Sequence, residues 1–431
     1  MKSIYGEAIM ILQLLAIRSS GILALFLVNV AIARNFGPVI LGLFQIGLAL
    51  VIVGATVGRW GQDQLMLRTA AEAKATEDIN YAHVQLKASL ALACIFLTLG
   101  TTVALALVQA GLIKTQGSQS EAFFLIMMLA ILPAGILMIV TEALRGWQKV
   151  NLSIAWQGSI PQSIFLVLVG AITLTVSKNP LWIPVAYVFA YVIAAVFAYF
   201  SWVKISRQGT RAPSHTSLIR TFKHGQYFWL YAVLTSVIAW VDVFILSYLG
   251  NAEIVGNYSA VVRTGAILGT IVQIASAGAV GRLAVLYAQS DYAQFLRVFR
   301  FYFKLFLIGS IPLLLALLAF SDQLMTIWGL EYRDAGTQLM IYGGFQTVNF
   351  ALCLAGFCAP VIGLERQLII VQVIALIAKI VLIYVGYESA GIEGALFAAG
   401  TSLFIFNLLT VQILLAKLRQ NGINGKQLLI G

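Results

Sequence analysis

Twelve long apolar stretches dominate this chain of 431 residues and set its fold class. A helix of about 20 apolar residues crosses the hydrocarbon core of a bilayer, and each stretch is close to that length or longer. Only 10% of the residues are charged, whereas soluble domains contain about 25%. The predicted spans are residues 12–33, 39–58, 87–109, 122–142, 151–176, 181–203, 226–249, 257–281, 302–320, 336–361, 367–387 and 391–416. The sequence therefore predicts an all-α integral membrane protein with about twelve transmembrane helices.

Short patterns recur in the two halves of the chain at offsets of 213 to 217 positions. The matches are Asn29-x7-Gly37 with Asp242-x7-Gly250, Gly42-x-Phe44 with Gly256-x-Tyr258, and Gly146-x-x-Lys149 with Gly363-x-x-Arg366. Many secondary transporters consist of two repeated halves with the substrate path between them. We therefore expect two six-helix lobes, residues 1–208 and 209–431, related by an internal repeat.

The net charge of +11 has a membrane explanation, because cytoplasmic loops collect Lys and Arg. With the N-terminus inside and twelve spans, twenty of the 27 basic residues fall on the cytoplasmic side. Those outside are Arg34, Lys114, Lys178 and Arg333, and those within spans are Arg18, Arg263 and Lys379. This asymmetry predicts that both termini are cytoplasmic and gives no reason to expect nucleic-acid binding.

Away from the ends of the predicted spans lie three cations and one acid, and ionisable residues in such places usually face a cavity or a partner. Arg18 either reaches the cytoplasmic headgroups or faces a cavity, and Lys379 lies deep enough to favour a cavity. Asp242 and Arg263 flank the turn near Glu253 at similar distances, so an antiparallel helix hairpin places them at similar depth. They form either a structural ion pair or a site in which Arg263 binds an anion and Asp242 couples or gates transport.

This balance of charge suits an anionic cargo such as a lipid diphosphate, because Arg forks and Lys ammonium groups bind phosphate oxygens. Arg18, Arg263 and Lys379 are the candidate substrate contacts, and Asp242 is the candidate coupling acid. Glu142, at the cytoplasmic end of the fourth span, is expected to pair with Arg145 at the surface.

Motifs of catalysis and metal binding are absent from the sequence. The cysteines Cys94, Cys353 and Cys358 have no metal or disulfide spacing, and no nucleotide-binding P-loop or nucleophile elbow occurs. No predicted outward loop is large enough for a catalytic domain. We therefore expect no catalytic residues, no metal and no cofactor.

Three segments resemble bacterial polysaccharide flippases of the O-antigen type, within the multidrug and polysaccharide exporter superfamily. They are residues 33–44 after Arg18 (ARNFGPVILGLF), residues 142–149 (EALRGWQK) and residues 249–260 after Asp242 (LGNAEIVGNYSA). The resemblance implies a V-shaped pair of lobes that alternate in access. It also implies an undecaprenyl-diphosphate-linked oligosaccharide as cargo, moved from the cytoplasmic to the outer leaflet of the inner membrane.

Two other functions stay open at this stage. A cation-coupled multidrug or metabolite exporter of the same fold would usually carry an acid in the first helix, where this chain has Arg18 and Asn29. A polysaccharide polymerase or ligase would need a large outward loop. Besides the lipid-linked oligosaccharide and the bilayer, the candidate partners are a polysaccharide polymerase and chain-length proteins.

Overall fold

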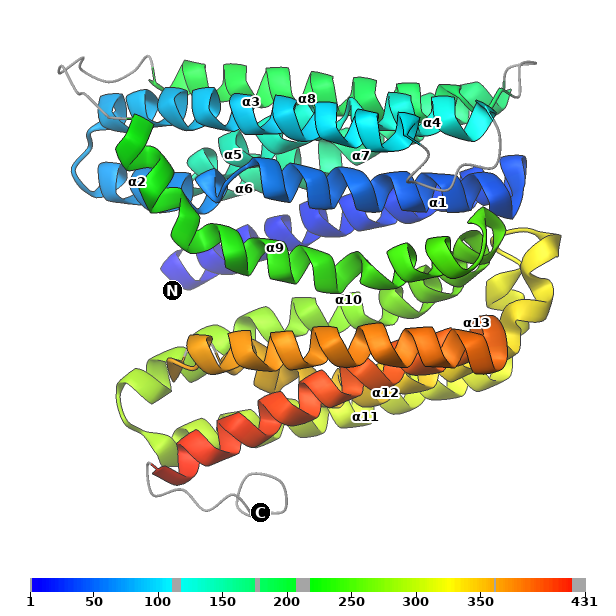
Figure 1. Ribbon diagram of the computed structural model, residues 1–431. Helices are drawn as coiled ribbons and strands as arrows, with labels where there is room; N and C mark the ends of the chain where they lie inside the picture. Colours follow the sequence, from blue (N-terminus) through cyan, green and yellow to red (C-terminus); the bar gives the residue numbers. More distant parts are fainter. Residues whose placement is uncertain (1, 111–117, 175–178, 207–217, 360–361, 421–431) are drawn as a thin grey trace. The chain divides into compact units, whose positions relative to one another are not determined.

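The computed structural model describes residues 2–110, 118–174, 179–206, 218–359 and 362–420. Every regular element in these ranges is helical (Figure 1). The predicted boundary between the lobes, at 208/209, lies outside the described residues. By contacts, the chain divides into a first unit, Met1–Trp240 with Gly250–Gly256, and a second unit, Val241–Leu249 with Asn257–Gly431.

The first unit begins with a helix hairpin, both helices of which carry the single label α1. Helix α1 (Lys2–Gly58) is two helices joined at Gly37, whose φ of 80° and ψ of 177° are not helical. Glycine adopts a positive φ without steric cost, and Pro38 begins the next helix because it has no N–H to leave unpaired. Across the hairpin, the Gln45 side-chain amide donates a hydrogen bond to the Asn29 side-chain oxygen. Both side chains are buried.

Helix α2 (Gln62–Ala75) is short and amphipathic. It packs against α3 (Ile79–Gln109) and α5 (Ile131–Gly146) through an apolar face that contains Leu65 and Met66, while Arg68 and Glu72 face outward. Asp78 caps α3 by accepting a hydrogen bond from the backbone N–H of Tyr81 at 2.9 Å. The sequence therefore places an amphipathic helix between the second and third predicted spans, as an interfacial helix requires.

The rest of the first unit includes three elements that pack against α5. Its elements are α4 (Ser118–Met128), α6 (Val150–Ile154), the π-helical turn η1 (Ala155–Ser159), α7 (Ile160–Leu174), α8 (Trp182–Ser206) and most of α9 (Leu218–Leu249). The start of α9 is held by an aromatic stack, in which the Trp60 ring lies 5.0 Å from Phe222 and 4.7 Å from Trp229. This stack explains why residues 218–240 belong to the first unit by contacts.

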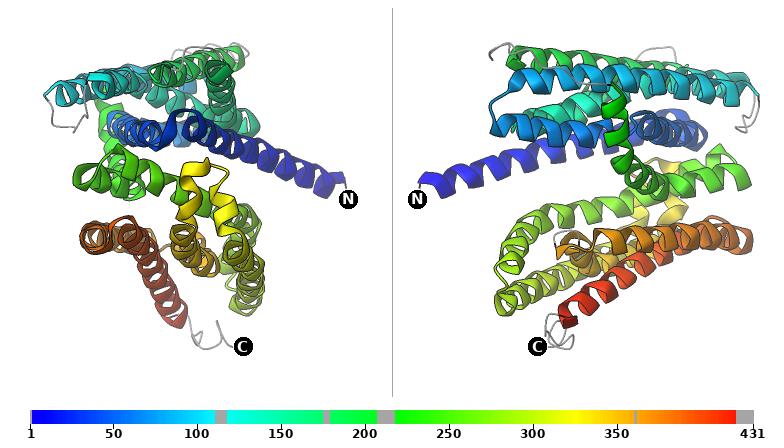
Figure 2. Two further views of the ribbon diagram at one scale, coloured as in Figure 1. Left: turned by 90° about the vertical axis from the view of Figure 1, so that its right-hand side faces the viewer. Right: turned by 60° about the vertical axis from the view of Figure 1, so that its left-hand side comes forward.

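The second unit contains the end of α9 and four further helical segments. These are α10 (Ala252–Ala288), α11 (Tyr292–Met325), the 3-10 turn η2 (Leu330–Ala335) with α12 (Gly336–Cys358), and α13 (Glu365–Gln420). Like α1, α13 is two helices, joined at Ala390 and Gly391, and the two parts diverge from that turn in Figures 1 and 2. A core that includes Phe295, Phe299 and Leu354 packs α10, α11 and α12 against the end of α13.

The helix lengths confirm the predicted fold class. Eight stretches in the described residues are long and apolar enough to cross a membrane, and two of them, in α1 and α13, are double. Helices α10 and α12 cover the remaining predicted spans, 257–281 and 336–361, so the described helices account for all twelve. Large apolar side chains such as Leu174, Phe200 and Ile308 are exposed, which suits a surface in contact with lipid.

Candidate functional site

A buried carboxylate on α9 is the centre of the polar cluster in the second unit. Asp242 is only 7% exposed and lies within the membrane-crossing part of α9. Its Oδ2 lies 3.2 Å from Lys379 Nζ and accepts a hydrogen bond from the Tyr258 hydroxyl at 2.8 Å. Its Oδ1 accepts a hydrogen bond from the Val243 backbone N–H at 3.1 Å. Both carboxylate oxygens are therefore satisfied by groups from three helices.

The geometry gives Asp242 a partner that the predicted hairpin did not include. Lys379 comes from α13 and forms the ion pair, while Arg263, on α10, interacts electrostatically with Asp242 and with Tyr342 of α12. An uncompensated charge inside a membrane protein is expensive, so one acid and two cations from separate helices hold each other in place. Arg263, Lys379 and Asp242, three of the four residues singled out from the sequence, thus belong to one cluster.

Two further hydrogen bonds lie around this cluster, one within α12 and one from the turn after α11. Gln346 Nε2 donates a hydrogen bond to the Tyr342 hydroxyl at 2.6 Å. The neighbour of Arg263, Thr264, accepts a hydrogen bond from the buried Trp328 indole at 2.7 Å. The Trp328–Thr264 contact ties α10 to the turn after α11, next to Arg263, while the Gln346–Tyr342 contact lies within α12.

An apolar groove lies between the two helices that carry the ion pair. It has a volume of about 420 Å³ and runs between α9 and α13, which contribute residues that directly follow Asp242 and Lys379. Its lining is Phe244, Ile245, Tyr248, Leu249, Ile380, Val381, Tyr384 and Val385. The second unit therefore joins a charged cluster to a surface that favours hydrocarbon.

Arg18, the fourth candidate residue, lies in the first unit. It is exposed and lines a pocket of about 410 Å³ together with Arg145, Gln157 and Gln162. The pocket is bounded by α1, the end of α5 and the segment from α6 to α7. Arg18 is therefore close to a second arginine that the sequence analysis had assigned only to a surface pair.

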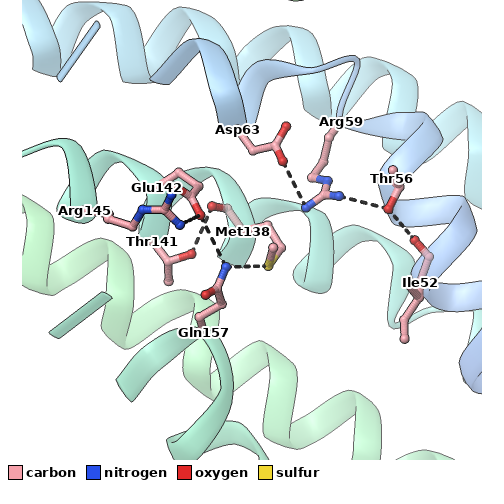
Figure 3. A network of polar contacts seen from close by, with 9 residues as sticks. All are labelled: Ile52, Thr56, Arg59, Asp63, Met138, Thr141, Glu142, Arg145 and Gln157. Atoms are coloured by element: carbon pink, nitrogen blue, oxygen red, sulfur yellow. Dashed lines mark hydrogen bonds and ion pairs between the residues drawn. The ribbon is translucent and has the colours of Figure 1, made fainter. Parts of the chain in front are cut away.

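Next to this pocket lies the buried polar network drawn in Figure 3. Glu142 forms the expected pair with Arg145, at 3.1 Å, but Glu142 is 2% exposed and so is not at the surface. Arg59 and Asp63, at the start of α2, form a second buried pair at 3.4 Å. The spacing of Glu142 and Arg145 indicated their contact, whereas the burial of Glu142 depends on the packing of α2 and η1 over α5, which no local pattern reveals.

Tyr258 is the main contact that the sequence reasoning missed. It was noted only as part of a repeated pattern, yet its hydroxyl holds Asp242. A signal was present, because Tyr258 follows Asp242 at the same spacing as Gln45 follows Asn29. In the described part of the chain, no group of three or more His, Cys, Asp or Glu side chains is arranged to hold a metal.

These features define a class of protein: a polytopic α-helical membrane protein with buried ion pairs and a repeated helix hairpin. A family model described as "Polysaccharide biosynthesis protein" matches residues 11–282, which is more than half of the chain. The chain therefore belongs to this family, as the resemblance predicted. The match contains Arg18, Asp242 and Arg263 and ends before Lys379. No curated protein matches the sequence.

Solved structures with the same fold are transporters of low sequence identity. An inward-facing multidrug resistance MATE family transporter of the MOP superfamily has a TM-score of 0.78 and 14% identity, over 95% of this chain and 98% of that chain. The inward closed lipid II flippase MurJ has a TM-score of 0.73 and 15% identity, over 93% and 87%. The Vibrio cholerae MATE transporter VcmN D35N mutant has a TM-score of 0.67 and 15% identity, over 97% and 99%. The chain has the fold of these membrane transporters.

Proposed function

We propose that this protein is a flippase for an undecaprenyl-diphosphate-linked oligosaccharide, such as an O-antigen, capsule or exopolysaccharide repeat unit. It carries the diphosphate and sugars from the cytoplasmic to the outer leaflet of the inner membrane by alternating access between lobes 1–208 and 209–431. The family match and the fold shared with a lipid II flippase support this proposal. The observation that carries it is the Asp242–Lys379 pair on the two helices that also line an apolar groove.

The paired charges provide a way to bind and release an anion. A diphosphate that approaches the cluster competes with Asp242 for Lys379 and Arg263, both of which bind phosphate oxygens well. Asp242 keeps the Tyr258 hydroxyl when Lys379 turns to the cargo, so the carboxylate is not left without a donor. When the diphosphate leaves, Asp242 recovers its cation. The acid thereby holds the empty site together and favours release.

The groove beside the pair suits the isoprenoid part of the same cargo. Its walls are almost entirely hydrocarbon, and it begins one residue after Lys379 and two residues after Asp242. A lipid diphosphate has a charged group and a hydrocarbon chain in one molecule, and α9 and α13 carry both the ion pair and the apolar groove.

We propose that both chain termini are cytoplasmic, that the polymerase and chain-length proteins act on the released glycan, and that this chain catalyses no covalent step.

The test is export of surface polysaccharide at matched levels of membrane protein. Lys379→Ala is expected to insert normally, because it deletes a charge that is costly in the bilayer, and to export less glycan. Lys379→Arg is expected to keep part of the activity because the charge remains. Lys304→Ala, at an exposed position on α11, is the matched control and should export like the parent. Export by Lys379→Ala at the parental level would overturn the role of Lys379.

A second candidate function is that of a cation-coupled drug or metabolite exporter. A buried acid in the first unit favours it. Glu142 is such an acid. A deletion strain separates the two functions: loss of surface polysaccharide without a change in drug susceptibility supports the flippase. Increased drug susceptibility with normal polysaccharide supports the exporter.

A further inference from the structure

The pocket at Arg18 in the first unit has the composition of an anion site. Two guanidinium groups, Arg18 from α1 and Arg145 from the end of α5, line it together with the side chains of Gln157, Ser159 and Gln162. Its volume of about 410 Å³ is in the range of small-molecule sites. Arginine forks are suited to phosphate because they donate two parallel hydrogen bonds.

Contacts between α1 and η1 hold the pocket walls together. The Ser159 hydroxyl donates a hydrogen bond to the backbone carbonyl of Ile17, the residue before Arg18. One turn further along α1, a methyl group on Gly21 would lie 3.0 Å from the backbone of Ser159, so the two segments are in close contact. The π-helical turn that contains Gln157 and Ser159 is a local widening of the helix, and such turns are frequent at functional sites.

Arg145 has two possible partners, the pocket and Glu142. Its side chain is 44% exposed, whereas the Glu142 side chain is 3% exposed. Glu142 Oε1 lies 3.1 Å from Arg145 Nη1 and 3.4 Å from Gln157 Nε2. Glu142 Oε2 is buried without a hydrogen-bond partner (Figure 3). A buried carboxylate with one unsatisfied oxygen depends on its cation to stay charged.

The other charges that act on Glu142 come from the turn between α1 and α2. Asp63 opposes a negative charge on Glu142 and Arg59 favours it. Arg59 and Asp63 pair with each other at 3.4 Å, and the effect of Asp63 on Glu142 is the larger of the two. Burial disfavours the charge on Glu142, and Arg145 is the strongest of the neighbouring groups that favour it, so displacement of Arg145 favours the protonated acid.

We propose that this pocket binds a phosphate-bearing anion through Arg18 and Arg145, and that Glu142 takes up one proton when the anion draws Arg145 away. The proton comes from the buffered bulk solvent, and the neutral acid keeps its contact with Gln157. This inference rests on the proposed function in taking the diphosphate of a lipid-linked glycan as the ligand. It adds a second site for that group, in the first unit, where binding of the anion is linked to proton uptake by Glu142.

Isothermal titration of the purified full-length protein tests both parts. The probes are inorganic pyrophosphate and farnesyl diphosphate, each titrated in buffers of different ionisation enthalpy. The dependence of the binding enthalpy on the buffer gives the number of protons taken up, and about one proton per bound anion is expected. If only farnesyl diphosphate binds, the ligand is a lipid headgroup. If both probes bind equally, the diphosphate group is sufficient for binding without a lipid chain.

Variants separate the anion site from the proton site. Arg145→Gln and Arg18→Gln should each weaken binding about tenfold, as expected for one lost charge-assisted contact. Glu142→Gln should bind the anion without proton uptake. Arg68→Gln, in the exposed Arg68–Glu72 pair of the same unit, is the matched control and should behave like the parent.

Two results would overturn the inference. If neither probe binds, or if both arginine variants bind like the parent, the pocket is not an anion site. If the parent binds without proton uptake, or if uptake persists in Glu142→Gln, the linkage to Glu142 is wrong. The titration does not depend on glycan export. If the proposed cargo is wrong, a deletion strain will have normal surface polysaccharide, whatever the titration shows.

Discussion

Tyr258 donates a hydrogen bond to Asp242 across sixteen positions of the chain, and Gln45 donates one to Asn29 across the same sixteen positions. Asp242 follows Asn29 by 213 positions, and Tyr258 follows Gln45 by the same number. Both pairs join the first two helices of a half and are buried. The two halves therefore join their first two helices through polar pairs of equal sequence spacing, with neutral amides in the first half and an acid with a phenol in the second.

Tyr258→Phe removes the hydroxyl that holds Asp242 and nothing else from the ring. A hydrogen bond to a charged group contributes about 1.5–3 kcal/mol, so we expect a lower melting temperature of the purified protein. Tyr384→Phe, at a largely exposed position on α13, is the control and should leave the melting temperature unchanged. Equal melting temperatures of Tyr258→Phe and the parent would show that the hydrogen bond contributes little.

The Asp242–Lys379 pair should show strong coupling in a double-mutant cycle. Asp242→Asn leaves Lys379 and Arg263 without their acid and is expected to destabilise the protein by roughly 3–5 kcal/mol. The double variant Asp242→Asn with Lys379→Met should recover much of that loss and still fail to export glycan. Thermal unfolding and surface polysaccharide are the two measurements. The exposed Arg68–Glu72 pair provides the control cycle, in which no coupling should be detectable; additive effects at Asp242 and Lys379 would contradict this prediction.

Gly42 and Gly256 let two backbone segments of the first unit approach closely. A methyl group on Gly42 would overlap the carbonyl oxygen of Ala252, and one on Gly256 would overlap that of Pro38. Gly42→Ala should therefore destabilise the protein by roughly 1–3 kcal/mol, as overpacking does. Gly100→Ala is the control, since a methyl group there meets nothing within 4 Å, and the helix gains about 0.5–1 kcal/mol from the substitution. If Gly42→Ala is as stable as the parent, the two backbone segments can move apart without loss of stability.

The distribution of basic residues predicts the orientation of the chain in the membrane. Reporter fusions at Lys178 and after Lys417 should read outside and inside, respectively, because the cytoplasmic side collects Lys and Arg. A fusion after Lys149, which is expected on the cytoplasmic side, provides an internal reference. The reverse pattern would invert the topology and the proposed direction of transport.

Sequence reasoning predicted the helices well because hydrophobic length is a local property. It also singled out Asp242 and Lys379, because each is a charge within an apolar stretch. Their pairing was not predicted, since it depends on how α9 and α13 pack, and no local pattern reports that. Glu142 shows the same limit: its contact with Arg145 follows from helical spacing, but its burial requires α2 and η1 to cover it.

The two polar pairs differ in what can disturb them. Asn29 and Gln45 are neutral side chains, so the hydrogen bond between their amides involves no charge. Asp242 contacts both the Tyr258 hydroxyl and the cation Lys379, so the second hairpin is joined to α13 through an ion pair. An anion that competes for Lys379 therefore acts on the second hairpin and leaves the contact in the first hairpin unchanged.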